Sequence, residues 1–435
     1  MSEPEAQSSG RAWSDQVDGG RLRKRHRRER RFRILGAASI GFALASLVIL
    51  LASIAWQGVS VFTQFQVSLA IDLAADEIDP EATGDPEVMG TANFSALVKA
   101  SLREIFPDVS GRKNKRRLYS LVSSGASYAV RDSVIEAPGI VGSTVVYRVP
   151  VSAEADLYLK GKVSRSTPQD RRKLKDDQME WLDVLRERGA LVRVFNWGFF
   201  IHGDSREPEL AGVGGAIVGS LLTLLVTLIV CFPVGVAAAI HLEEFAPKNR
   251  LTDLIEVNIN NLAAVPSIVF GLLGLAIFLG PLGMPRSAPL VGGLVLALRT
   301  LPVIIIVSRA SLAAVPPSIR EAALGLGASR IQLIAHHLLP LAFPGILTGT
   351  IIGMAQALGE TAPLLMIGMV AFVADIPEGF LSPSTVLPVQ IFLWSDAPER
   401  GFEALTAGAI IVLMAFLLLL NAVAVFLRHR YETRF

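Results

Sequence analysis

Two charged residues lie deep inside apolar stretches of this 435-residue chain: Arg299 in the stretch 289–307 and Glu360 in the stretch 340–373. Charges within a bilayer are rare and usually functional. Glu360 follows Pro340 by about 20 residues, so on a helix it lies roughly 30 Å further along, near or just beyond mid-bilayer. Arg299 lies about midway along its own stretch. The two side chains can therefore pair, either as a gate or charge setting for a pathway or as a purely structural ion pair.

The residues around Glu360 break the apolar pattern. Gly359-Glu-Thr-Ala-Pro363 interrupts a helix, and the hydroxyl of Thr361 can donate a hydrogen bond. Interrupted helices near the midplane are a recurring feature of transporter sites, although this comparison is an analogy. An anion pathway needs arginine, free N–H groups or helix N-termini. The candidate pathway and gate residues from this pattern are Arg299, Gly359, Glu360, Thr361 and Pro363, and a family resemblance given below adds Gln356.

Six apolar segments are long enough to position these residues within a membrane, since about 20 residues span the hydrocarbon core. The 227 residues from 209 onward hold only 24 of the 80 charged residues. The sequence therefore predicts an all-α polytopic membrane protein with six transmembrane helices, at about 34–56, 210–240, 262–284, 289–307, 340–373 and 404–427.

The charge distribution predicts the orientation. Residues 1–33 carry ten Lys/Arg, a basic cytoplasmic tail rather than a nucleic-acid site. Residues 34–56 are too long and lack a cleavage signal for a secretory leader, so we interpret them as a retained first transmembrane helix. Six spans return the C-terminus, with Arg428, Arg430 and Arg434, to the cytoplasm. The sequence therefore predicts a bacterial inner-membrane protein with both termini in the cytoplasm.

Residues 57–208 then form an exterior, periplasmic insertion with nearly balanced charge. Strand-forming residues at 144–152 and helical spacing at 92–105, 115–130 and 169–188 predict an α+β domain. Its basic run at 112–117 could attract an anion or a lipid headgroup, but a solvated surface is the favoured interpretation. The chain has one cysteine, Cys231, and neither a catalytic constellation nor a P-loop, which indicates a non-enzymatic protein without metal or cofactor.

Glycines recur at every fourth position along the fifth predicted span, at Gly345, Gly349 and Gly353, and a second pair, Gly215 and Gly219, lies on the second span. Small residues at this spacing favour close contact with a neighbouring helix. Lining of the pathway is the alternative interpretation of the same stripe.

The cytoplasmic loop 309–340 carries the most specific motif. Pro316 and Pro317 suit a first helical turn, Glu321 lies where a carboxylate favours the helix dipole, and Gly327 ends or bends the helix. A short helix of this polarity is expected to lie along the membrane face as a lever between the spans and a soluble partner.

This loop resembles that of ABC-importer permeases, which have Glu-Ala-Ala, three residues, Gly, nine residues, then Ile-x-Leu-Pro. The matching residues here are Glu321, Ala322, Ala323, Gly327, Leu339 and Pro340, with His337 in place of the isoleucine. The resemblance implies that residues 316–340 dock in a groove of a separate ATPase subunit. An ordinary interhelical loop is the alternative.

Segments 261–274, 344–349 and 357–365 are similar to the PstA type of phosphate permease, and the resemblance covers 209–430. It implies a phosphate importer with a PstC-type permease partner, a PstB-type ATPase dimer and a periplasmic phosphate-binding protein, PstS. That family often has arginine where this chain has Ile306 and Gln356. We therefore expect Arg299, or an arginine of the partner permease, to supply the positive charge of the pathway. A permease for another solute or oxyanion, or a phosphate-sensing signalling component, remains the alternative.

Overall fold

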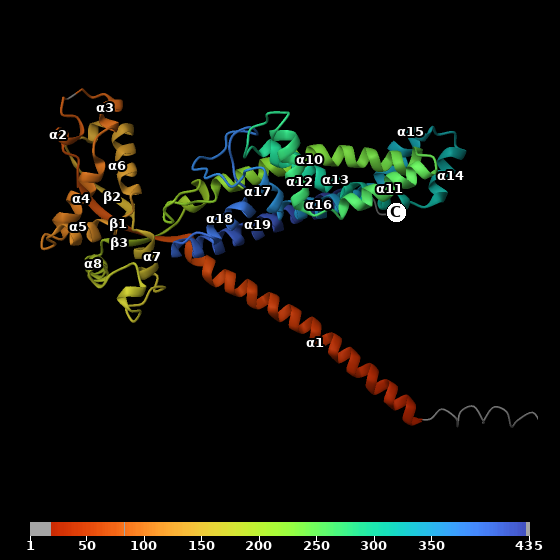
Figure 1. The fold of residues 1–435 in the computed structure, drawn as a ribbon, viewed down its shortest axis with the longest axis horizontal. Helices are drawn as coiled ribbons and strands as arrows, with labels where there is room; N and C mark the ends of the chain where they lie inside the picture. Colours follow the sequence, from red (N-terminus) through yellow and green to blue (C-terminus); the bar gives the residue numbers. More distant parts are fainter. Residues whose placement is uncertain (1–18, 82, 432–435) are drawn as a thin grey trace, which may run out of the picture. The chain divides into compact units, whose positions relative to one another are not determined.

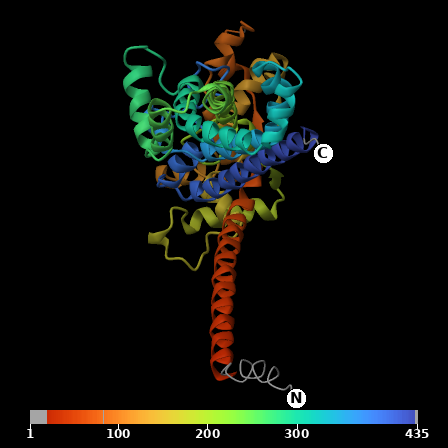
Figure 2. The same ribbon diagram turned by 90° about the vertical axis from the view of Figure 1, so that its right-hand side faces the viewer.

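The computed structural model describes residues 19–81 and 83–431, which form two units, one ending at Trp56 and one beginning at Gln57. The first 18 residues of the predicted basic tail, and Arg434, lie outside the described residues. The first unit is built from α1 (Gly19–Gly58), a continuous helix that Figures 1 and 2 show as one rod. Among the described residues of the first unit, the large apolar side chains of this helix are mostly exposed, as expected for a helix surrounded by lipid.

A three-stranded antiparallel sheet organises the insertion, in the order β2–β1–β3 (Figure 1). The strands are β1 (Thr63–Asp72), β2 (Thr144–Pro150) and β3 (Leu191–Phe195). In the central strand Val67, Leu69 and Ile71 alternate with more exposed residues and are fully buried. This period of two puts one face of the sheet against a helical layer, which makes the insertion α+β.

Short helices cover that face of the sheet and supply the rest of the core. Only β2 and the helix at 92–105 were predicted at nearly the correct positions; β1 and β3 were not predicted. The helices are α2 (Ala75–Ile78), α3 (Pro86–Gly90), α4 (Phe94–Ile105), α5 (Arg112–Tyr119), α6 (Gly125–Glu136), α7 (Ala153–Leu159) and α8 (Asp176–Glu187), with 3-10 turns η1 (Val59–Phe62), η2 (Pro138–Ile140) and η3 (Gln169–Arg171).

The predicted helix 115–130 is wrong, because the chain leaves helical geometry between α5 and α6 to extend the sheet. Val122 forms a bridge with Val151, and the N–H of Ser123 donates to the Pro150 carbonyl at 3.0 Å. A backbone group that pairs with a strand cannot also belong to a helix. Helix α6 therefore starts afresh at Gly125.

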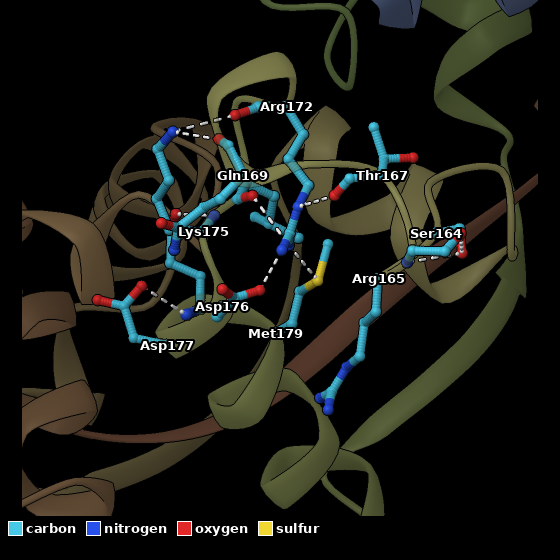
Figure 3. Close-up of polar contacts among 12 residues, drawn as sticks. Ser164, Arg165, Thr167, Gln169, Arg172, Lys175, Asp176, Asp177 and Met179 are labelled. Atoms are coloured by element: carbon cyan, nitrogen blue, oxygen red, sulfur yellow. Dashed lines mark hydrogen bonds and ion pairs between the residues drawn. The ribbon is translucent and has the colours of Figure 1, made fainter.

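The helix predicted from Gln169 begins only at Asp176, and the buried Arg172 side chain explains the difference (Figure 3). Its Nε donates to the Thr167 carbonyl at 3.0 Å and its Nη2 pairs with Asp176. Nη1 lies 2.8 Å from Met179 Sδ. The guanidinium thus holds residues 167–176 in a closed loop. The N–H of Lys175 donates to Gln178 Oε1 at 3.0 Å, and this hydrogen bond caps the first turn of α8.

The second half of the chain is helical: α9 (Gly198–Ile201), α10 (Gly214–Ile240), α11 (Arg250–Ala263), α12 (Ser267–Gly274), α13 (Pro289–Ala313), α14 (Pro317–Gly325), α15 (Arg330–Leu333), α16 (Leu339–Leu358), α17 (Ala362–Met366), α18 (Leu387–Ser395) and α19 (Arg400–Tyr431). Helices α10, α13 and α16 pack in sequence beside one another. Three helices continue directly into π-helical turns. Turn η4 (His241–Phe245) follows α10, η5 (Leu275–Leu279) follows α12, and η6 (Ile334–Leu338) follows α15.

Five helices among the described residues are long and apolar enough to cross a membrane. The predicted third span, 262–284, is wrong as a single helix. Helices α11 and α12 meet at an angle of 98° across a short break and count together as a sixth candidate span. Pro266 lies in this break, and its missing N–H prevents continuation of α11. The fold class, an all-α membrane protein with an α+β insertion, is confirmed.

The predicted fifth span, 340–373, is likewise two helices. Helix α16 ends at Leu358, and α17 begins at Ala362. The interruption predicted at Gly359–Pro363 is therefore confirmed. Helix α13 is longer than predicted and reaches Ala313, which places Arg309 on a helix rather than in the loop.

The linker from the insertion to α10 is held to the insertion by two carboxylates. Ser124 Oγ donates to Glu207 Oε2 at 2.6 Å, and the Ala153 N–H donates to Glu209 Oε2 at 3.1 Å. Burial raises the pKa of Glu209, and the neighbouring Glu207 carboxylate adds to the increase. Both carboxylates lie where helices of the insertion begin, which favours negative charge there.

We expect Glu209→Gln to raise the thermal stability of the full-length protein at pH 7.5. A carboxyl whose pKa is raised in the folded state binds more protons than in the unfolded state, so stability falls as pH rises through and above the ordinary glutamate pKa of 4.5. The advantage of the variant should therefore shrink as pH is lowered toward 4.5. Thermal unfolding in detergent across this range measures it, with Glu104→Gln at an exposed position as the control. A pH-independent difference would contradict the prediction.

Candidate functional site

Helices α13 and α16 approach closely because glycines line the contact. A Cβ added at Gly349 would lie 2.1 Å from Val307 Cγ1, and one at Gly345 would lie 2.5 Å from Ser311 Oγ. The contact of Gly353 is with Thr300. Partner numbers fall as glycine numbers rise, so the helices are antiparallel. The packing interpretation of this stripe is confirmed. At Gly219 the close neighbour is the Thr385 carbonyl, in a loop rather than a helix.

We expect Gly349→Ala to destabilise the protein by about 1–3 kcal/mol, the usual cost of forcing a methyl group into a filled contact. The branched Val307 side chain must shift, and α13 with it. The measurement is thermal unfolding of the purified protein in detergent. Gly325→Ala is the matched control, since no atom lies within 4 Å of a Cβ added at this position on α14. Equal unfolding temperatures for the two variants would contradict the prediction.

The close contact brings the two intramembrane charges together, as the sequence predicted. Arg299 Nη2 lies 2.6 Å from Glu360 Oε1, and the two side chains are 17% and 18% exposed. This ion pair joins the apolar part of α13 to the segment just after α16. A charge-assisted bond of this length is a strong interaction, and removal of either partner leaves the other charge unpaired and largely shielded from solvent.

The break after α16 places Glu360 on irregular backbone. The N–H of Gly359 donates to the Gln356 carbonyl and that of Glu360 to the Ala357 carbonyl, so the helix ends in tight 3-10 turns. Gln356 and Gly359 are exposed on this chain, and Thr361 is half-buried. The structure thus gathers Arg299, Gln356, Gly359, Glu360 and Thr361 around one helix end.

Pro363 differs from the other predicted pathway residues, because it is buried in a packing contact. A Cβ on Gly271 of α12 would lie 2.7 Å from Pro363 Cα and 2.8 Å from its carbonyl oxygen. The two short helices α12 and α17, which each follow a break, therefore pack directly against one another. This contact supports the irregular segment that carries Glu360.

The predicted motif loop contains α14, and Gly327 ends it as predicted. Its φ is +87°, and the following N–H of Ala328 donates to the Ala323 carbonyl at 3.1 Å. This is a Schellman cap, which requires a left-handed residue at the glycine position. Glu321 and Ala322 point outward, whereas Ala323 is buried in an apolar cluster with Leu312.

The second half of the motif joins the loop to α16 without a break in the helix. Ser329 and Gln332 form a reciprocal capping box at the start of α15. The π turn η6 ends shortly before Pro340, which has no N–H and so cannot donate a helical hydrogen bond. Leu339 is half-buried and Pro340 exposed. Leu326 and Ile331 are 90% and 72% exposed, which leaves an apolar surface on this loop.

Sequence reasoning missed a set of ion pairs beneath α14. Arg320 Nη2 lies 2.9 Å from Glu244 Oε1 on η4. Arg309 of α13 reaches Glu256 on α11 at 2.8 Å and Glu243 at 3.5 Å. The partners are separated by 53 to 76 residues, so only the helix packing reveals them. The only sign of these ion pairs in the sequence is the group of charged residues at the ends of the apolar segments.

Comparison with known proteins places the two parts of the chain separately. Residues 231–435 match the family described as "Binding-protein-dependent transport system inner membrane component", and residues 20–169 match "Domain of unknown function (DUF3333)". The PstA phosphate transport permease of Mycobacterium leprae is 33% identical over 57% of this chain and 83% of its own length. That of Yersinia pestis is 33% identical over 50% and 73%.

The probable ABC transporter permease YqgI of Bacillus subtilis is 31% identical over 49% of this chain and 76% of its own length. A solved structure of the MetNI methionine transporter in inward-facing conformations overlaps 49% of this chain and 95% of its own at 15% identity, with a TM-score of 0.40. The sequence matches define the class of this protein, a multi-pass permease subunit of an ABC importer. Within that class the chain belongs to the family of PstA-type phosphate permeases.

Proposed function

We propose that this permease forms half of the pathway of an ATP-driven phosphate importer. The observation that carries the proposal is the match to proteins named as PstA phosphate permeases over most of their own length. A homologous PstC-type permease would supply the other half, a PstS-type binding protein would deliver phosphate, and a PstB-type ATPase dimer would supply ATP hydrolysis. The permease itself would have no enzymatic role.

The pathway would pass the Arg299–Glu360 pair. Gln356 and Gly359 are exposed on the isolated chain beside this pair, on a face that the partner permease would complete. Arginine is the side chain best suited to a phosphate oxygen, since its guanidinium donates two parallel hydrogen bonds. Competition between phosphate and Glu360 for Arg299 would keep the anion from being held too tightly to leave.

The ATPase would bind the surface around α14. The motif residues Glu321 and Ala322 and the apolar Leu326 face away from this chain. Ala323, Gly327, Leu339 and Pro340 would hold the shape and register of the loop. Exposed apolar residues of this size on a short, capped helix are typical of a surface that another protein covers.

Orientation follows from the positive-inside rule, with the ATPase surface and the N-terminal arginines in the cytoplasm and residues 57–208 in the periplasm. The exposed Trp197 and Phe195 rings, 4.8 Å apart near the start of the membrane core, suit the lipid–water interface on the outer side. This orientation corresponds to a protein of the inner membrane. We divide the chain into the cytoplasmic tail 1–33, the first transmembrane helix 34–56, the periplasmic domain 57–208 and the permease core 209–430.

Uptake of radiolabelled phosphate tests the proposal. The permease would be reconstituted in vesicles with its partner permease and ATPase, and supplied with binding protein and ATP. Phosphate accumulation that exceeds sulfate accumulation is the expected result. Uptake of another solute would mean that the protein is an importer permease for a substrate other than phosphate. An assembled complex that accumulates none of them would favour the signalling alternative.

A further inference from the structure

The arginines Arg309 and Arg320 are half-buried, and the proposed pathway and ATPase surface do not use them. Arg320 directly precedes Glu321 on α14, but its side chain points inward, with 23% of its surface exposed. Besides Glu244, it donates to the carbonyls of Leu312 and Val315, at 2.9 Å and 3.2 Å. One guanidinium therefore joins α14, the end of α13 and the end of α10.

Arg309 makes a second connection between helices. Its guanidinium bridges Glu256 of α11 and Glu243 of η4, with all three side chains at most about one-third exposed. The carboxylates of Glu243 and Glu244 follow one another at the end of α10 and take different arginines. Two arginines and three glutamates thus tie four helices together, and we call this set the arginine brace.

Without the arginine brace, only apolar contacts would fix the position of α14 relative to the helices beneath it. The cluster beneath α14 consists of short aliphatic residues, among them Ala323, Leu312 and Leu338. Such contacts are non-directional, whereas a guanidinium with several fixed acceptors holds one geometry. Movement of α14 therefore has to move the brace carboxylates or break these bonds.

We propose that the arginine brace transmits movement of the ATPase-bound loop to α10 and α11, and that Arg320 and Glu244 are its positioning residues. This inference rests on the proposed function, in which the ATPase drives α14. Through Arg320, displacement of α14 pulls the end of α10; through Arg309, the displaced α13 pulls α11. Helix α10 is packed along α13, which carries Arg299, so the movement reaches the intramembrane pair.

The test measures phosphate transported per ATP hydrolysed in the reconstituted complex. Arg320→Gln is expected to retain the co-purified ATPase and its hydrolysis but to lower this ratio about tenfold, within the usual range for coupling between sites. Glu244→Gln, on a different helix and outside the ATPase surface, should lower it similarly. The double variant should be no worse than either single one, because both remove the same contact.

Arg320→Lys is expected to recover part of the ratio, since it keeps the charge next to Glu244 but not the fork to two carbonyls. The matched control is Arg250→Gln, an exposed arginine at the start of α11. An unchanged ratio in Arg320→Gln, additive losses in the double variant, or loss of the bound ATPase would overturn the inference. Absence of uptake in the wild-type complex would instead overturn the proposed function.

Discussion

Replacing Arg299 by glutamine is expected to lower phosphate uptake about 100-fold in the assembled transporter. A factor of 100 corresponds to about 2.7 kcal/mol, within the strength of a charge-assisted hydrogen bond to an anion in a site of low dielectric. The loss has two sources. The anion loses its arginine donor, and the carboxylate of Glu360, now without the partner 2.6 Å away, repels it. The measurement is the initial rate of radiolabelled phosphate uptake.

A double variant separates these sources. Arg299→Gln combined with Glu360→Gln removes the unpaired, mostly buried carboxylate and should restore the stability lost in the single variant, but uptake should stay low if Arg299 binds the anion. Gln356→Arg, one helical turn before Glu360, is expected to return part of the uptake by supplying the arginine that the family often has there. Arg286→Gln, exposed in a loop outside the helices, is the control. Normal uptake and substrate choice in Arg299→Gln would remove this residue from the pathway.

The pairing of Arg299 with Glu360 could be predicted from sequence because both depend on a one-dimensional property, depth along a helix. Rise per residue converts position into depth, and two opposite charges at one depth have few other partners. The end of α14 at Gly327 was predictable for a similar reason, since a left-handed cap is a local requirement that glycine meets. The glycine stripe of α16 also identified a close contact, but not its partner.

The broken α11–α12 pair could not be predicted from hydropathy, since α11 carries Asp253 and Glu256 and fell outside the apolar window. The arginine brace requires knowledge of which helix ends meet, and its partners lie more than 50 residues apart. In the insertion, β1 had a readable period of two at Val67, Leu69 and Ile71. This signal is weak, because the intervening residues Gln66, Ser68 and Ala70 are polar or small.

Replacing Leu326 by aspartate is expected to abolish binding of the ATPase while the permease remains folded. The side chain is 90% exposed and follows the last turn of α14, so the substitution removes almost no contact within this chain. Within a complex, by contrast, a leucine in a pocket contributes about 1.5–3 kcal/mol, and a carboxylate placed there without a partner costs more. Together these terms reduce affinity by at least about 100-fold.

Co-purification of the ATPase with tagged permease, and surface-based affinity measurement in detergent, both report this loss. Leu282→Asp is the matched control, because Leu282 is also exposed, at 59%, but lies in the loop after α12 on the side assigned to the periplasm. Glu321→Gln should weaken binding less, since an exposed carboxylate contributes through one or two hydrogen bonds rather than a buried surface. Retention of the ATPase by Leu326→Asp, with an unchanged affinity, would mean that the exposed leucine and its neighbours face solvent or lipid. The coupling surface would then have to lie elsewhere on the cytoplasmic loops.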